Sequence, residues 1–322
     1  YNISIILDLS GSMNDGGEGF DGSKLAMAKE ALATFINETI AKHDGEIHLQ
    51  LVTFSKTAKE ENTWTLLSAD NPNAAEHNAS EIGEIISQLN VLKASGGTNY
   101  EQALKTSAEW FNTDVRENGG TNLAYFITDG NPTLYGSEGN KGDGQHSDRQ
   151  TVEHALDAAK ALQKAGGGVE VNAIGIGKAL EGYGESILDL IDNTTASGQT
   201  TPTTEFWYEE FEGFFIFGSW EWKNDNKDGL ASGDADLVYT PDGLTAALQG
   251  GSSGLHIDLV PAGSDKIDAS RSDSSSIIYG DTLNTDMLRA ALVAAGIEIP
   301  DNMLPGSGSS VFDWLEDLAN AD

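Results

Sequence analysis

The sequence has 322 residues and a hydrophobic content of 39%, which is enough for a packed core and argues against wholesale disorder. Its 51 acidic and 18 basic residues give a formal net charge of −33, which excludes general attraction to nucleic acids or to anionic membranes. The absence of cysteine excludes disulfides, thiolate metal ligands and a cysteine nucleophile. No apolar run approaches the roughly 20 residues of a membrane span. Because the sequence starts in a strand-like run without an initiator Met or signal peptide, we expect it to be part of a longer protein.

Strands and helices are predicted to alternate along the first 190 residues, because apolar runs are followed by stretches with one apolar stripe. The predicted strands are Ile3–Leu7, Ile47–Phe54, an edge strand over 62–68, Asn122–Thr128 and Val169–Ile176. The predicted helices are Lys24–Lys42, Ser80–Leu89, Tyr100–Glu117, Asp148–Ala165 and Gly184–Asp192. This order is typical of an α/β fold with a doubly wound, mostly parallel, Rossmann-like sheet flanked by helices, which binds ligands beyond the carboxyl ends of its strands.

The alternation is interrupted over about residues 193–234, where aromatic runs and β-branched neighbours predict an inserted hairpin. We expect its rings to form a local core, with a second contact surface as the alternative. A final strand and helix follow over 236–248. We therefore assign residues 1–250 to one domain and the turn-rich, acidic residues 251–322 to a C-terminal extension.

Oxygen-bearing side chains occur in three loops at the predicted carboxyl edge of the sheet. Asp8, Ser10 and Ser12 follow the first strand at alternate positions, so a curled loop can direct three oxygens to one centre. Thr98 follows two glycines that allow a sharp turn, and Asp129 ends a later strand. Oxygen ligands of this kind suit Mg²⁺, Ca²⁺ or Mn²⁺.

Three sequence features, Asp-x-Ser-x-Ser at 8–12, Gly-Gly-Thr at 96–98 and Thr-Asp-Gly at 128–130, resemble the von Willebrand factor type A (VWFA) domain. In that family these positions form a metal-ion-dependent adhesion site. The resemblance implies that Ser10, Ser12 and Thr98 offer hydroxyl oxygens, and that Asp8 and Asp129 act largely through water or from just behind the ligands. It also implies that a carboxylate of a partner macromolecule completes the metal shell.

Other polar residues are weaker candidates. The loop after Asp129 should border the metal, so Asn131, Tyr135 and His146 are candidate ligand contacts. The six histidines are scattered without a triad setting, and position 14 is Asn where a nucleophile elbow needs Gly. We expect no enzymatic activity, although so many acids make chance carboxylate pairs common.

Residues 263–288 resemble the flank of RTX adhesins, the type I-secreted surface proteins of Gram-negative bacteria. The likeness rests on Gly-Ser-Asp-Lys-Ile-Asp at 263–268 and on Ile-Ile-Tyr-Gly-Asp-Thr-Leu-Asn-Thr-Asp at 277–286. It implies additional Ca²⁺ at Asp265 or Asp281. Asp225 and Asp228 resemble part of another Ca²⁺ loop, although no Glu occurs at the expected distance.

Together these resemblances imply a metal-dependent adhesion module, a monomeric part of a larger adhesin on the bacterial cell surface. Its expected ligand is a protein or glycan on a host, another microbe or a surface, and the expected roles are attachment and biofilm formation. One alternative is a structural module that braces the RTX-like segment, with the metal as a stability staple. Another is a cytosolic protein of the same family that acts in complex assembly.

Overall fold

The computed structural model describes residues 1–16, 22–43, 45–115, 119–195, 200–214 and 217–250, and the backbone of 278–279 and 282–283. The chain divides into two compact units, Tyr1–Ser264 and Asp265–Asp322. The described part of the second unit is an antiparallel strand pair, β9 (Ile278–Tyr279) and β10 (Thr282–Leu283). The first unit contains the candidate site.

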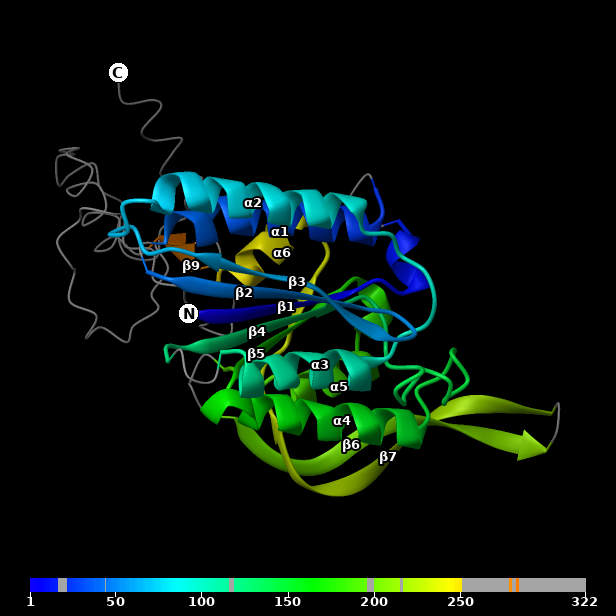
Figure 1. Ribbon diagram of the computed structural model, residues 1–322. Coiled ribbons are helices and arrows are strands. Elements are labelled where there is room, and N and C mark those ends of the chain that lie inside the picture. The colour runs from blue at the N-terminus through cyan, green and yellow to red at the C-terminus, as the bar shows by residue number, and fades with distance from the viewer. Residues whose placement is uncertain are drawn as a thin grey trace. The chain divides into compact units, whose positions relative to one another are not determined.

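A six-stranded sheet forms the centre of the first unit, in the order β3-β2-β1-β4-β5-β8 (Figure 1). Only β3 runs antiparallel to its neighbour. All seven residues of β1 are buried, as expected for a central strand covered on both faces. The sheet strands are β1 (Asn2–Asp8), β2 (Ile47–Phe54), β3 (Ala58–Leu66), β4 (Asn122–Thr128), β5 (Glu170–Ile176) and β8 (Asp236–Val238).

Helices cover both faces of the sheet, which confirms the predicted α/β class. Helices α1, α2 and α6 lie on one face, and α3, α4 and α5 lie on the other (Figure 1). Each layer has its own apolar cluster, so neighbouring residues of β1 such as Ile5 and Ile6 pack in opposite directions. The helices are α1 (Lys24–Glu38), α2 (Ala74–Val91), α3 (Tyr100–Thr113), α4 (Arg149–Lys164), α5 (Tyr183–Ile191) and α6 (Pro241–Leu248), with short 3-10 turns at Gly11–Asn14, Ile40–Lys42, Ala165–Gly167 and Lys178–Leu180.

Several element boundaries differ from those expected: β3 begins at Ala58 rather than at 62, and α3 ends at Thr113 rather than at 117. The first helix ends at Glu38, where the β-branched Thr39 is followed by a separate 3-10 turn that buries Ile40. Helix α2 begins at Ala74 rather than at residue 80. Its first turn is rich in alanine and contains Glu76, which favours a helix N-terminus.

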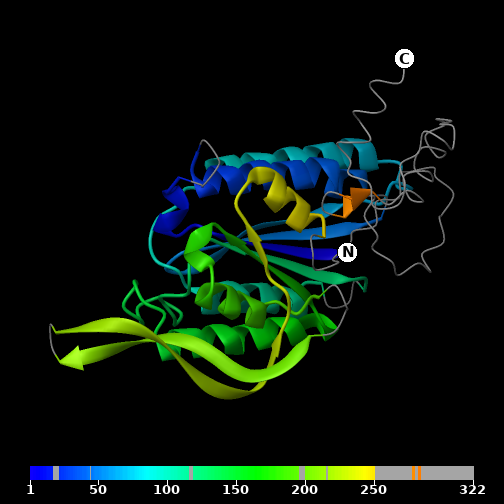
Figure 2. The ribbon, with the colours of Figure 1, turned by 180° about the vertical axis from the view of Figure 1, so that it is seen from behind.

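The predicted insertion is a long antiparallel hairpin of β6 (Thr201–Phe214) and β7 (Phe217–Ser232). Its base curves beneath α4 and α5, and its tip extends beyond the carboxyl edge of the sheet (Figures 1 and 2). Phe206 is fully buried in the core under α4 and α5. Near the tip, Phe211 and Trp220 are 40% and 36% exposed. The hairpin base therefore belongs to the main core, and the tip does not.

Among the described residues, no helix combines the length and apolar character needed to cross a membrane.

Candidate metal centre

Asp8 is the last residue of β1 and is completely buried. Its Oδ1 accepts a hydrogen bond from the Ser10 N–H at 2.6 Å. Its Oδ2 accepts a hydrogen bond from the Thr128 hydroxyl at 2.6 Å. Because β1 and β4 are parallel neighbours, this contact joins two adjacent strand ends. The Asp8 carboxylate is thereby held in a fixed orientation.

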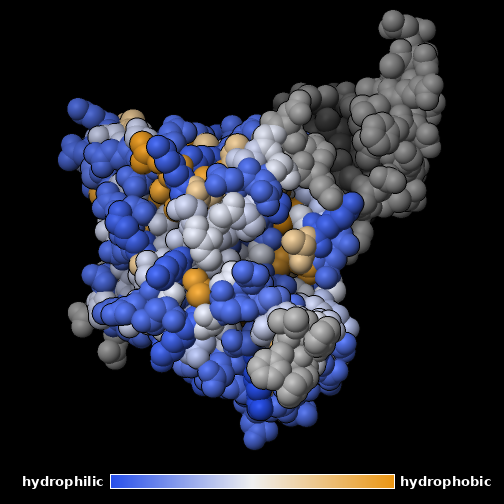
Figure 3. Space-filling view, turned by 90° about the vertical axis from the view of Figure 1, so that its right-hand side faces the viewer, coloured by the Kyte–Doolittle hydropathy of each residue, from blue (hydrophilic) through white to orange (hydrophobic). Residues whose placement is uncertain are grey.

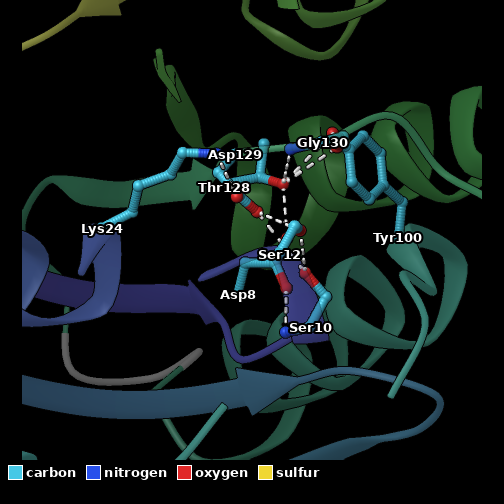
Figure 4. Close-up of polar contacts among 8 residues, drawn as sticks. All are labelled: Asp8, Ser10, Ser12, Lys24, Tyr100, Thr128, Asp129 and Gly130. Carbon is cyan, nitrogen blue, oxygen red and sulfur yellow. Dashed lines mark hydrogen bonds and ion pairs between the residues drawn. The ribbon is translucent and has the colours of Figure 1, made fainter. Parts of the chain in front are cut away.

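Ser12 lies in the 3-10 turn that follows β1, and Ser10 is the residue just before that turn. The two hydroxyl oxygens are 3.0 Å apart. The Ser12 hydroxyl donates to Asp129 Oδ1 at 2.8 Å, and the Ser10 hydroxyl lies 3.5 Å from the same oxygen (Figure 4). The Ser10 and Ser12 hydroxyls thus converge on one carboxylate oxygen of Asp129, while the Asp8 carboxylate contacts the Ser10 N–H and Thr128.

Asp129 immediately follows β4 and is 1% exposed. Its Oδ1 is directed to the serines, and its Oδ2 lies 2.8 Å from the Lys24 ammonium. The next residue, Gly130, accepts a hydrogen bond through its carbonyl from the Tyr100 hydroxyl at 2.5 Å. Tyr100, at the start of α3, therefore fixes the backbone beside Asp129 (Figure 4).

Thr98 is 5% exposed. Its loop is hydrogen-bonded to the loop after β1 and to the loop after β4. The Gly96 carbonyl accepts from the Gly11 N–H at 2.8 Å, and the Thr98 carbonyl accepts from the N–H groups of Thr133 and Leu134 at 2.9 and 3.0 Å. In the described part of the chain, no side-chain hydrogen bond joins Thr98 to the other four candidate ligands, Asp8, Ser10, Ser12 and Asp129. The structure therefore brings the Thr98 loop to the site without placing its hydroxyl in direct contact.

The electrostatics of the cluster favour a cation. Burial, reinforced by the neighbouring Asp129 carboxylate, raises the pKa of Asp8 to about 7. The hydrogen bonds from Thr128 and Ser10 act in the opposite direction. Uncompensated negative charge is costly in a buried site, and a cation would relieve that cost.

The chemistry of the donor set fits a hard divalent cation that retains water. Carboxylate and hydroxyl oxygens are the ligands that Mg²⁺, Mn²⁺ and Ca²⁺ prefer. The described residues contain no group of three or more His, Cys, Asp or Glu that could enclose a metal. A metal here would depend on the hydroxyls of Ser10 and Ser12, on one or both carboxylates, and on water. The Lys24 ammonium on Asp129 shows that the cluster already accepts a positive group.

The candidate ligand-contact residues have different surroundings. Asn131 has a buried side-chain oxygen without a hydrogen-bond partner. Tyr135 is only 9% exposed, and its hydroxyl donates to Gln150 at 2.6 Å, so it supports the loop rather than presenting a surface. His146 stacks on Trp220 of the hairpin at 4.0 Å between ring centroids. The face around these loops is mostly hydrophilic, with scattered apolar groups (Figure 3).

Asp225 and Asp228, the residues that resemble part of a Ca²⁺ loop, both lie in strand β7. The Asp225 carboxylate pairs with Arg149 at 2.7 Å, and the Asp228 carbonyl accepts from Lys160 at 2.9 Å. The spacing of the acids alone does not reveal that strand β7 of the hairpin extends through this segment. Asp265 and Asp281, the other candidate Ca²⁺ residues, lie outside the described residues.

Lys24 and Tyr100 were not anticipated from the sequence. The sequence does contain an indication for Lys24, because a lysine at the first position of a helix is unfavourable next to the positive end of the helix dipole. Such a lysine is expected to have an acidic partner. Tyr100 carried none, because only the fold brings its hydroxyl to Gly130.

The fold and the cluster define a class: an α/β domain with carboxylates and hydroxyls at the carboxyl edge of a mostly parallel sheet. Residues 3–131 match the family model of the von Willebrand factor type A domain. This match spans β1 to β4 and includes all five candidate metal ligands. No curated protein matches the chain.

Solved structures with similar folds include a bacterial minor pilin and a pilus adhesin. The PilB minor pilin from Streptococcus sanguinis is 17% identical, with a TM-score of 0.46, over 77% of this chain and 59% of that chain. The pilus adhesin SpaC from Lactobacillus rhamnosus GG is 16% identical, with a TM-score of 0.48, over 77% and 30%. A von Willebrand factor type A protein from Catenulispora acidiphila is 19% identical, with a TM-score of 0.37, over 63% and 44%. The present chain thus spans less than two thirds of each of these relatives.

Proposed function

We propose that this protein is a non-enzymatic, metal-dependent adhesion module. The observation that carries the proposal is the convergence of the Ser10 and Ser12 hydroxyls on Asp129, directly beside the buried Asp8 carboxylate. The match of residues 3–131 to the type A domain family supports it. Mg²⁺ or Ca²⁺ is the proposed metal, with Mn²⁺ as a further candidate.

The proposed roles follow from the contacts of each residue. Ser10 and Ser12 offer neutral oxygens, while Asp129 orients the Ser12 hydroxyl by accepting a hydrogen bond from it. Asp8 holds the turn through the Ser10 N–H and adds negative charge from behind. Thr98 supplies a further hydroxyl if its loop adjusts. When bound, the cation supplies an electrophilic position that a carboxylate of another macromolecule can fill.

The biological setting is part of the proposal. The acidic, cysteine-free composition and the RTX-like segment support a module of a larger adhesin, exported by type I secretion to the bacterial surface. There it would bind a protein or glycan ligand and promote attachment and biofilm formation. Additional Ca²⁺ in the C-terminal extension, at Asp265 or Asp281, would couple folding to export.

Binding of Mn²⁺, followed by paramagnetic relaxation of ¹³C-labelled acetate, tests the proposal. The wild-type protein should bind one Mn²⁺ in this domain, and the bound ion should enhance acetate relaxation. Asp129→Ala and Ser12→Ala should each weaken Mn²⁺ binding at least tenfold, about 1.4 kcal/mol. Glu30→Gln, a change of one surface carboxylate on α1, is the control. Equal Mn²⁺ affinity in wild type and Asp129→Ala would contradict the proposal.

The second candidate is a stability staple, favoured by the hydrogen bonds that link the three loops at this edge. Thermal unfolding with and without Mg²⁺ separates the two roles. A staple predicts a large rise in melting temperature and no acetate relaxation by bound Mn²⁺. A recognition site predicts clear acetate relaxation.

A further inference from the structure

Lys24 and Ser12 contact opposite oxygens of the same carboxylate. The Lys24 ammonium lies 2.8 Å from Asp129 Oδ2, and the Ser12 hydroxyl donates to Asp129 Oδ1 at 2.8 Å. In Figure 4 the lysine approaches Asp129 from the side away from the serines. Lys24 therefore holds Asp129 from behind and leaves Oδ1 directed at the candidate metal position.

The position of Lys24 in its helix is unfavourable by itself. It is the first residue of α1, at the positive end of the helix dipole, and the first turn contains no acid. Its side chain is 13% exposed, so much of the ammonium's hydration is lost. The contact with Asp129 is thus a specific compensation, made across 105 residues of sequence.

The ammonium also changes the charge of the site. Asp8 and Asp129, when ionised, contribute two negative charges, and Lys24 returns one positive charge at contact distance. A divalent cation bound beside them is then only partly neutralised by the protein. A buried cation that keeps net positive charge attracts an anion strongly, because the local dielectric is low.

We propose that Lys24 sets the selectivity of the centre: it weakens retention of the bare cation and strengthens capture of an anionic ligand by the loaded site. Lys24 is a positioning and charge-setting residue, not a metal ligand. The inference rests on the proposed function, since it concerns the same metal centre.

The distinguishing feature is a pair of effects with opposite signs. In Lys24→Met, Mg²⁺ affinity measured by calorimetry should rise about tenfold, the size expected for removing a like charge near the ion. In the same variant, the Mn²⁺-dependent relaxation of ¹³C-acetate should fall. A purely structural role of Lys24 would instead weaken both properties together. Circular dichroism and thermal melting establish that each variant is folded.

Two further variants complete the test. Lys24→Arg keeps the charge and should keep both wild-type properties. Lys42→Met removes the same charge beyond the other end of α1, where the lysine pairs with Glu38, and should change neither property. Parallel changes of both properties in Lys24→Met, or no change, would overturn the inference and leave the proposed function standing. Absence of Mg²⁺ and Mn²⁺ binding in the wild type would overturn the proposed function as well.

Discussion

The hydroxyl of Thr128 donates to Asp8 across the two central strands, with 2.6 Å between Thr128 Oγ1 and Asp8 Oδ2. Both side chains are completely buried. A buried carboxylate depends on such donors, because no solvent is present to replace them. This contact sets the direction of Asp8 at the edge of the sheet.

Thr128→Val should therefore destabilise the fold by about 2 kcal/mol, because a hydrogen bond to a charged group is lost while the side-chain volume is kept. It should also weaken Mg²⁺ binding, because Asp8 is no longer oriented. Urea unfolding and calorimetry measure the two effects. Thr113→Val, on an exposed helix end, is the matched control and should alter neither. An unchanged stability in Thr128→Val would show that the contact is not maintained in solution.

Asp192 predicts a pH dependence of stability that is independent of the metal centre. Burial raises its pKa to about 7, although hydrogen bonds from Ala173 and Thr194 act against the rise. The folded state therefore holds a proton more tightly than the unfolded chain. This contribution to stability is complete below the ordinary pKa of about 4 and is lost as the pH rises through about 7.

Urea unfolding of the wild type and of Asp192→Asn, both with chelator, measures the effect between pH 4 and 8. Asp8 and Asp189 also have raised pKa values and act in the same direction, so the comparison between variants isolates Asp192. The stability of the wild type should fall more steeply, by roughly 1.4 kcal/mol for each unit of pKa shift. Parallel pH profiles would contradict the raised pKa.

Phe206 and Phe211 predict a contrast between the base and the tip of the hairpin. Phe206 is 0% exposed, whereas Phe211 is 40% exposed. Phe206→Ala should cost about 3–5 kcal/mol, the usual range for emptying a buried phenylalanine site. Phe211→Ala should cost less than about 1 kcal/mol. Similar losses measured by urea unfolding would mean that the hairpin does not pack as described.

The position of Trp220 predicts that the hairpin restrains the motion of the loop after Asp129. Its ring stacks on His146, and the next residue, Ser147, donates its N–H to the Glu209 carboxylate at 2.7 Å. Trp220→Ala should speed hydrogen exchange of the amides around His146 and Ser147, with little change in global stability. Val91→Ala, at a 65% exposed position on α2, serves as the control. Unchanged exchange in Trp220→Ala would separate the loop from the hairpin.

Much of the sheet and the gathering of four side chains follow from local pattern. An apolar strand ending in Asp8 and another ending before Asp129 must bring these residues to one edge if the strands are parallel neighbours. The alternation in Asp-x-Ser-x-Ser then decides which hydroxyls join them. These are short-range properties of the chain, and hence visible in the sequence.

The remaining features depend on distant contacts that no local pattern encodes. The partner of Lys24 is 105 residues away, and the partner of Asp225 is in a different helix. A string of Asp and Asn looks the same in a Ca²⁺ loop and on the polar positions of a strand. Only the register of β6 against β7 assigns Asp225 to a strand, opposite Phe206.

The two edge strands of the central sheet affect whether neighbouring molecules can pair strand to strand. One edge strand, β8, has only three residues, and the other, β3, contains Lys59, Glu60 and Glu61 at its charged end. Short or charged edges resist pairing with a strand from another molecule. Many copies held close together would therefore be protected from joining into a continuous sheet, and aggregation through the sheet edges would be disfavoured even at high local concentration.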